Sequence, residues 1–234
     1  MKRYYEELPH PYRIFEDFIG QIIHGGAEAL LDAGCGRSAP VLKNFKGKAR
    51  LLVGVDLVRF KADGGGLHLV NAELGRLPFA PNSFDCVFSR SVFEHLSDPL
   101  AVYKEIYRIL RPSGTLVFLT ANMWDYATVV ARLVPESWHG RIVKFAEGRE
   151  EEDTFPTFYK TNTYSAIERL CRASGFTIEK LEYLSQYPNY LTFNGFLFFF
   201  GTCYEHCIRR KKALRFLRGW ILAVLRKPEL YPDA

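Results

Sequence analysis

Two glycines and an acid form the first group of residues with the spacing of a ligand-binding loop. Gly34 and Gly36 stand two residues apart, Ala39 follows three residues later, and Asp32 precedes the first glycine by two. Glycine lets a backbone approach a ligand closely, and Gly-x-Gly-x-x-Ala is typical of loops that hold a dinucleotide pyrophosphate. The carboxylate of Asp32 is awkward beside a pyrophosphate and suits a cationic amino group.

More polar side chains follow later apolar runs. Asp56 lies 22 residues after Gly34, where an acid can accept from both ribose hydroxyls of an adenosine. Up to this point NAD and S-adenosylmethionine fit equally well. Asn71 and Glu73 then supply polar groups for an adenine edge, and Leu77-Pro78-Phe79 supplies an apolar wall. With Asp32 these groups favour an amino-acid tail that bears a sulfonium.

Apolar runs that alternate with amphipathic segments predict the elements that position these side chains. We expect strands at 29–34, 51–56, 67–73, 84–90, 115–120 and 176–184, and helices at 11–24, 38–45, 98–110 and 163–176, with Ser38 as a helix cap. Such alternation is typical of a doubly wound, mostly parallel α/β sheet, in which ligands bind beyond the carboxyl ends of the strands.

The ordered series LLDAGCG, GVD and NAELGRLPFAPNSFDCVFSRSVFEHLSDPLAVYKEIYRILRPSGTLVFLT resembles the class I S-adenosylmethionine-dependent methyltransferases, nearest to the quinone-biosynthesis subgroup, over residues 29–120. The resemblance implies a Rossmann-like, seven-stranded sheet with an antiparallel final strand, and S-adenosylmethionine as cofactor. The expected cofactor-binding residues are Asp32, Gly34, Cys35, Gly36, Asp56, Leu57, Asn71, Ala72, Glu73 and Ser89.

Two positions depart from the family pattern. Ser38 stands where the family often has glycine, and Asn71 stands where it often has aspartate. An asparagine oxygen can still accept from the adenine amino group. We therefore keep the adenine role for Asn71 and expect a slightly different course for the loop around Ser38.

His95 is the candidate catalytic residue, as a base for an acceptor hydroxyl. The competing interpretation is a histidine at a helix start that packs on Asp98 or on a lid. In-line methyl transfer depends largely on proximity and alignment, so a base is needed only for an acidic acceptor. Four other side chains belong to acceptor territory without a diagnostic spacing: Tyr12, Tyr126, His139 and Tyr159. No metal site is expected, because Cys203 and Cys207 have no evident further ligands.

The chain of 234 residues fits one methyltransferase domain at 1–190, with an insertion or lid at 121–163, and a C-terminal segment at 191–234. The net charge of +5 comes from the C-terminal segment, since residues 205–228 hold eight basic side chains against Glu205 alone. The neutral body argues against a nucleic-acid partner. No signal peptide is recognised, and we expect a cytoplasmic protein.

Residues 207–227 interleave basic and apolar side chains, which predicts an in-plane amphipathic helix on an anionic membrane surface. The alternative is that this segment packs on the sheet edge. The membrane interpretation favours an amphiphilic acceptor, such as a lipid-linked saccharide or a quinone precursor. Two other functions stay open: an NAD(P)-binding oxidoreductase, and a non-catalytic module that binds S-adenosylmethionine. The oligomeric state is not predicted.

Overall fold

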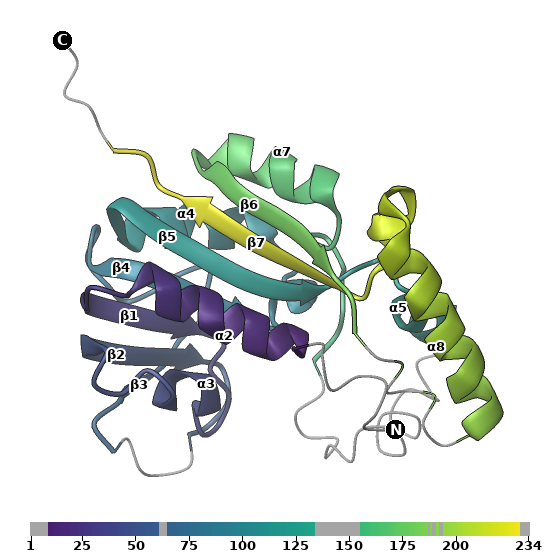
Figure 1. Cartoon of the computed structure of the whole chain (residues 1–234). Helices are drawn as coiled ribbons and strands as arrows, with labels where there is room; N and C mark the ends of the chain where they lie inside the picture. The colour runs from purple at the N-terminus through teal and green to yellow at the C-terminus, as the bar shows by residue number, and fades with distance from the viewer. Residues whose placement is uncertain are drawn as a thin grey trace.

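A single mixed sheet organises the chain (Figure 1), and the computed structural model describes residues 9–60, 65–133, 155–186, 188, 191 and 194–229. Seven strands lie in the order β3-β2-β1-β4-β5-β7-β6. The strands are β1 (Ala27–Ala33), β2 (Ala49–Asp56), β3 (His68–Asn71), β4 (Phe84–Arg90), β5 (Leu110–Ala121), β6 (Thr177–Leu184) and β7 (Trp220–Arg226). Strand β7 runs antiparallel to both β5 and β6. The expected seven-stranded sheet is confirmed.

Some helices cover the two faces of the sheet, and others stand at one of its ends. They are α2 (Pro11–Ile22), α3 (Pro40–Lys43), α4 (Pro99–Ile109), α5 (Tyr126–Leu133), α7 (Tyr164–Ser174) and α8 (Gly195–Arg210), with the short 3-10 helices η1 (Phe93–His95) and η4 (Lys212–Leu217). Local sequence explains several ends: Asp98 and Thr163 cap α4 and α7 through their side chains, and Gly175 ends α7 at φ 92°.

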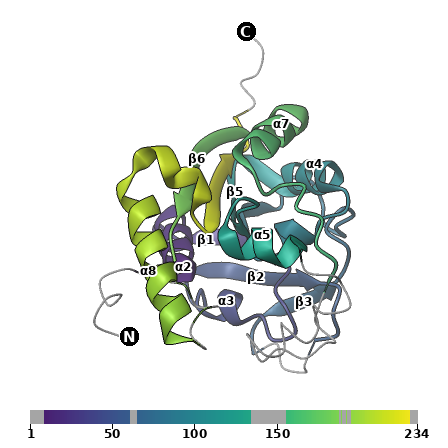
Figure 2. The ribbon, with the colours of Figure 1, turned by 90° about the vertical axis from the view of Figure 1, so that its right-hand side faces the viewer.

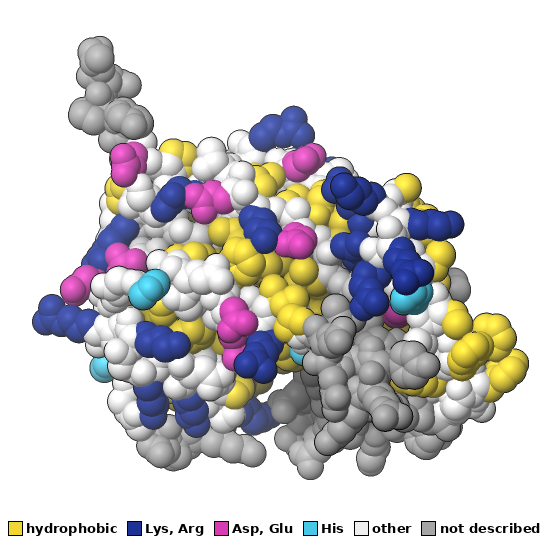
Figure 3. Space-filling view, in the orientation of Figure 1, with side chains coloured by type: hydrophobic (Ala, Val, Ile, Leu, Met, Phe, Trp, Pro, Cys, Tyr) yellow, Lys and Arg dark blue, Asp and Glu magenta, His cyan; other side chains and the backbone are white. Residues whose placement is uncertain are grey.

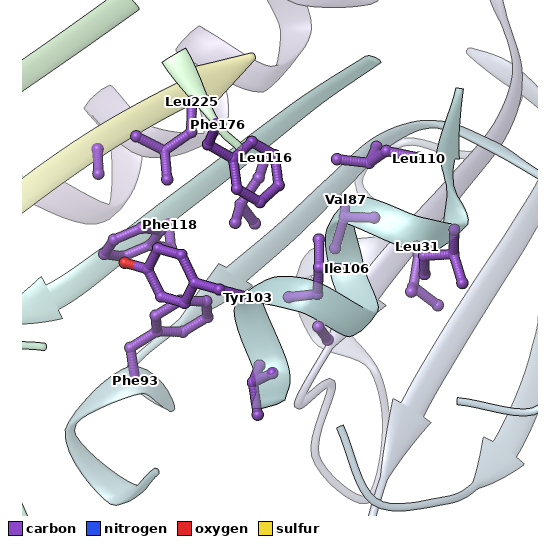
Figure 4. Close-up of a cluster of buried hydrophobic side chains, with 14 of the residues drawn as sticks. Leu31, Val87, Phe93, Tyr103, Ile106, Leu110, Leu116, Phe118, Phe176 and Leu225 are labelled. Carbon is purple, nitrogen blue, oxygen red and sulfur yellow. The ribbon is translucent and has the colours of Figure 1, made fainter. Parts of the chain in front are cut away.

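Two hydrophobic cores lie on opposite faces of the sheet. Helices α4 and α7 cover one core, and α2 and α3 cover the other. In the first core (Figure 4), Phe93 of η1 stacks on Phe118 of β5 with ring centroids 4.1 Å apart, and Tyr103 of α4 packs edge-on to both. This packing anchors η1, which carries His95.

The cap expected for the second helix is wrong. Ala39, not Ser38, is the N-cap residue of α3, and no side chain caps that helix. Ala39 adopts a left-handed conformation with φ 46°, which turns the chain sharply before Pro40. The helix is also shorter than expected, since it begins at Pro40 and ends at Lys43.

The C-terminal segment is not a separate unit. The helix expected over 207–227 is wrong: residues 195–210 form α8, residues 212–217 form η4, and residues 220–226 form β7 inside the sheet. The expected domain boundary at residue 190 therefore cuts between neighbouring strands of one sheet. The physical reason is that WILAVLR is a short apolar run with two β-branched residues, which gains more from two strand partners than from a helix.

The carboxyl ends of the parallel strands face the side where α5 and α8 stand (Figure 2). The expected insertion at 121–163 begins here with α5 and returns through residues 155–163 to α7; its middle part, 134–154, lies outside the described residues, as does His139. Within the described part of the chain, no helix is long and apolar enough to cross a membrane.

Candidate functional site

The end of β2 holds the glycine turn in place. The backbone N–H groups of Gly34 and Cys35 donate to the Val55 carbonyl at 2.8 and 3.1 Å. The N–H of Gly36 donates to Asp56 Oδ2 at 2.7 Å. Three successive amides are thus engaged by the protein itself. A pyrophosphate cradle needs such amides for the ligand, so this turn is poorly suited to a dinucleotide.

Asp32 supplies a buried negative group beside that turn. Its side chain lies on the same face of β1 as Leu30, toward α3, and the residue is only 2% exposed. Its Oδ2 has no hydrogen-bond partner. Burial raises the pKa of this carboxyl to about 8, against the opposing effect of Arg90. A buried carboxyl with one oxygen left unpartnered suits a cationic ligand group.

Gly34 is required by its surroundings. Its φ is +86°, and a Cβ at this position would lie 2.3 Å from Cγ2 of Val92. Gly36 also has a positive φ, of +68°, but faces open space. The two glycines therefore differ: Gly34 lets the Val92 side chain close over the turn, whereas Gly36 leaves room above the backbone for a ligand.

Asp56 bridges the turn and the end of β2. Besides the Gly36 amide, its carboxylate accepts from the Val58 N–H at 3.1 Å through Oδ1. Each carboxylate oxygen accepts one of these bonds and has further acceptor capacity. The half-buried carboxylate is thus fixed in orientation and still able to accept from a pair of hydroxyls.

Asn71 presents an acceptor to the space beyond β3. Its Nδ2 donates to the carbonyls of Asp56 and Val58 at 3.0 and 3.3 Å. Both amide hydrogens are therefore used, and Oδ1 is the group left for a ligand. The N–H of Ala72 donates to the Asp56 carbonyl at 3.2 Å, so Ala72 contributes shape instead of a hydrogen bond.

The other expected cofactor residues differ in accessibility. Leu57 is 59% exposed, an unusual state for a leucine directly after a buried strand, and Glu73 is also exposed. Cys35 is buried and packs toward Gly54. Ser89 is fully buried, and its hydroxyl donates to the Ala33 carbonyl at 2.6 Å. Ser89 thus supports the carboxyl end of β1, and its hydroxyl oxygen keeps the capacity to accept a further hydrogen bond.

His95 is held in one tautomer by the segment that precedes α7. Its Nδ1 lies 2.9 Å from the carbonyl oxygen of Pro156, and its ring packs edge-on to Phe155. A carbonyl only accepts, so Nδ1 carries the proton and Nε2 keeps its lone pair. The expected packing of His95 on the lid side is therefore observed, and its role as a base stays a prediction.

A buried polar network joins that same segment to the sheet. Thr120 of β5 donates to Glu94 Oε2 at 2.8 Å, and Asn162 Nδ2 donates to the Thr120 hydroxyl at 2.9 Å. The amides of Phe158 and Tyr159 donate to the Glu94 carbonyl. These bonds fix residues 155–162 over η1 and so fix the partner of His95.

The remaining acceptor candidates lie apart. Tyr12 stands at the start of α2, with its hydroxyl 3.4 Å from the Ser91 hydroxyl and its ring over Arg90. Tyr126 begins α5 and packs edge-on against Tyr204 of α8. Tyr159 sits in the segment over η1 with φ 50°. These three tyrosines therefore lie on different elements, and Tyr159 belongs to the same segment as Pro156, the partner of His95.

Three features of the site had no signal in the sequence. Arg90 opposes the charge of Asp32, and Val92 closes over Gly34. Glu205 of α8 is 3% exposed, with no partner for either carboxyl oxygen, and burial together with Asp125 raises its pKa to about 8. These contacts join segments far apart in the chain, which no local pattern reveals.

Known proteins share both the motif region and the fold. Residues 31–118 match the family described as methyltransferase domain. A 24-methylenesterol C-methyltransferase of Arabidopsis thaliana is 26% identical over 172 residues, which cover 69% of this chain and 45% of that protein. A ubiquinone/menaquinone biosynthesis C-methyltransferase of Haemophilus ducreyi is 38% identical over 69 residues, or 30% of this chain and 27% of that protein.

A solved structure extends the likeness beyond the motif region. The geranyl diphosphate C-methyltransferase of Streptomyces coelicolor, crystallised with S-adenosyl-L-homocysteine, superposes with a TM-score of 0.58 at 14% identity, over 92% of this chain and 80% of that one. The chain spans less than half the length of the two curated relatives described above. Residues 31–118, which hold the glycine turn and its acids, are therefore similar to the methyltransferase domain family, and the fold is shared with that solved methyltransferase.

Proposed function

We propose that the protein transfers a methyl group from S-adenosylmethionine to an amphiphilic small-molecule acceptor by in-line displacement. The observation that carries the proposal is the buried Asp32 carboxyl, whose Oδ2 has no hydrogen-bond partner, beside a turn whose amides are already engaged. That combination suits an ammonium-bearing ligand and disfavours a pyrophosphate. It therefore favours S-adenosylmethionine over NAD(P) as the ligand. The family match supports the same choice.

The residues of the carboxyl edge fit the cofactor group by group. Asp32 suits its amino-acid end, Gly36 leaves room beside the backbone, and Asp56 offers acceptors for ribose hydroxyls. Asn71 Oδ1 and exposed Leu57 offer an acceptor and an apolar surface for the adenine. When bound, S-adenosylmethionine supplies an electrophilic methyl group, so the protein itself needs to align an acceptor and exclude water.

Exposed apolar side chains support an acceptor with a hydrophobic part. Four such side chains are each more than 40% exposed: Trp124 before α5, Val130 on α5, and Phe155 and Phe158 in the segment over η1. Among the relatives, one is named for a 24-methylenesterol and one for geranyl diphosphate, and another is named for ubiquinone and menaquinone biosynthesis. An acceptor with an apolar body and one reactive polar group fits both observations.

His95 would take the proton of an acceptor hydroxyl. The Pro156 carbonyl holds Nδ1–H and so leaves Nε2 as the basic nitrogen. His95→Asn keeps an amide N–H for Pro156 and removes the base, whereas His95→Ala removes both. We expect both variants to lower kcat by about 100-fold or more with little change in KM. His24→Ala, at an exposed histidine, is the control.

The two His95 variants separate the two interpretations of this residue. Activity retained in His95→Asn and lost in His95→Ala would mean that His95 only positions the segment at Pro156. Turnover within a few-fold of the wild type in both variants, across pH 6 to 9, would show that no base is needed here.

Methyl transfer is tested with tritiated S-adenosylmethionine and the soluble and membrane fractions of a cell extract. We expect label in a compound that extracts into organic solvent, reduced strongly in Asp32→Asn and unchanged in the exposed control Asp17→Asn. Binding of S-adenosylmethionine without label in any fraction would favour the non-catalytic module. Preference for NADH in equilibrium binding would overturn the proposal.

A further inference from the structure

The outer face of α8 is unusually apolar for a surface helix. Phe196, Phe199 and Phe200 are 71%, 61% and 54% exposed, and they contact each other edge-on. The inner face of the same helix carries Gly201 and Glu205, both buried. A surface helix normally turns its apolar stripe inward. In α8 the phenylalanine rings face outward, and an exposed apolar patch of this kind indicates a surface that binds a partner.

The exposed stripe continues along the whole helix. Phe196, Phe199 and Phe200, then Cys203 and Cys207, recur at intervals of three and four residues and are all exposed. The 16 residues of α8 span about 24 Å, so the stripe is long enough to lie flat on a surface. A contact by the helix tip alone would leave most of this stripe in water.

Basic side chains surround the other end of the stripe. Arg209, Arg210, Lys211, Lys212 and Arg215 are all exposed on the last turn of α8 and on η4. Figure 3 shows the basic side chains gathered at one end of this region and the hydrophobic ones at the other. Arg226 and Lys227 do not belong to this cluster, because Arg226 pairs with Glu179 and Lys227 is buried under α4.

We propose that α8 lies flat on an anionic lipid surface, with its phenylalanine rings in the interface and its terminal basic cluster among the headgroups. Charge decides between a bilayer and a second copy of this chain. Exposed acids are absent from α8 and η4. A dimer formed through this face would therefore bury two basic clusters with no acid on either copy's face to pair with them. An anionic bilayer complements both the rings and the cations.

The lipid surface would meet the same side of the molecule as the cofactor site. Helix α8 stands with α5 at the carboxyl edge of the sheet, beyond β1, β2 and β4 (Figure 2). An acceptor with an apolar tail could then reach the site from the bilayer. This route rests on the proposed function, but docking of α8 does not, and the two are measured separately.

The test is co-sedimentation of the full chain with vesicles of phosphatidylcholine alone or with 30% phosphatidylglycerol. We expect binding to the anionic vesicles, weakened as NaCl rises from 50 to 500 mM. F196S/F199S/F200S should lower the partition coefficient by about tenfold or more, and K211A/K212A by about 20-fold. The controls are L51S/I178S, at exposed apolar side chains elsewhere, and K43A/K46A at exposed lysines.

Because the three phenylalanine side chains and the lysine side chains are exposed, the melting temperatures of their variants should match the wild type, and methyl transfer to a water-soluble acceptor should persist. Equal binding to neutral and anionic vesicles would overturn the role of the basic cluster. Absence of vesicle binding, or dimerisation that F196S/F199S/F200S abolishes in sedimentation equilibrium, would overturn the proposal. Failure of methyl transfer with intact vesicle binding would affect only the proposed function.

Discussion

At the scale of single residues, charge decides which ligand the glycine turn can accept. A turn with the same Gly-x-Gly spacing suits either a pyrophosphate or an amino acid, since glycine only provides space. Asp32 and Asp56 place two acids at this turn, and the Gly36 amide is already bonded to one of them. The turn is therefore surrounded by hydrogen-bond acceptors, and the positive charge of Arg90 opposes the charge of Asp32.

Asp32 should release a proton when the cofactor binds. Burial raises its pKa to about 8, so the carboxyl is mostly protonated at pH 7, and a nearby ammonium would ionise it. Titration calorimetry with S-adenosylmethionine in buffers of different ionisation enthalpy should show release of close to one proton. Asp32→Asn should abolish that release and weaken binding by roughly 1.5–3 kcal/mol.

Asp17→Asn is the matched control, because Asp17 is exposed on α2, and it should behave like the wild type. Equal proton release from wild type and Asp32→Asn would assign the proton to another group. Unchanged affinity in Asp32→Asn would remove this residue from the binding site.

At the scale of elements, the sequence was most informative where a pattern is local. The helices expected at 98–110 and 163–176 and the buried runs of β1, β2 and β4 follow from neighbouring residues, and the structure confirms them. The identity of β7 depends on β5 and β6, which lie far away in the chain. For the same reason the orientation of α8 could not be predicted: its inner face is defined by what it packs against.

The inner face of α8 makes stability depend on pH through Glu205. Its neighbours are Asp125 before α5, Tyr204 on its own helix, and the cations Arg209 and Arg218. Burial raises the pKa of Glu205 from 4.5 to about 8, so the folded state binds its proton more tightly than the unfolded chain. This contribution is complete below about pH 4.5 and is lost as the pH rises to about 8.

Glu205→Gln replaces the carboxyl with a neutral group of the same shape. Relative to the wild type, the variant should gain on the order of 2 kcal/mol in unfolding free energy between pH 6 and pH 9. Urea unfolding at pH 5, 7 and 9 measures this change, with the exposed Glu168→Gln as the control. A difference that stays constant over that range would mean that Glu205 is ionised throughout.

At the scale of the whole molecule, β7 is the last strand along the chain but lies inside the sheet, between β5 and β6. Residues Ile221–Leu225 of β7 are almost entirely buried, and β7 separates β5 from β6. The segment that carries the apolar and basic surface of α8 is therefore part of a loop between β6 and β7. A docked surface on α8 would be coupled to the sheet that holds the cofactor residues at its edge.

A chain that ends at residue 190 should fail to fold, whereas one that ends at residue 229 should melt like the full chain. Removing β7 exposes apolar surface from five buried residues, roughly 10 kcal/mol at 1.5–3 kcal/mol each, which is comparable to the whole stability of a domain. It also leaves the facing edges of β5 and β6 without hydrogen-bond partners. Circular dichroism and thermal unfolding of both fragments measure the outcome. A cooperative thermal transition in the fragment 1–190 would show that the domain does end before α8, and that β7 is an addition to a sheet already stable without it.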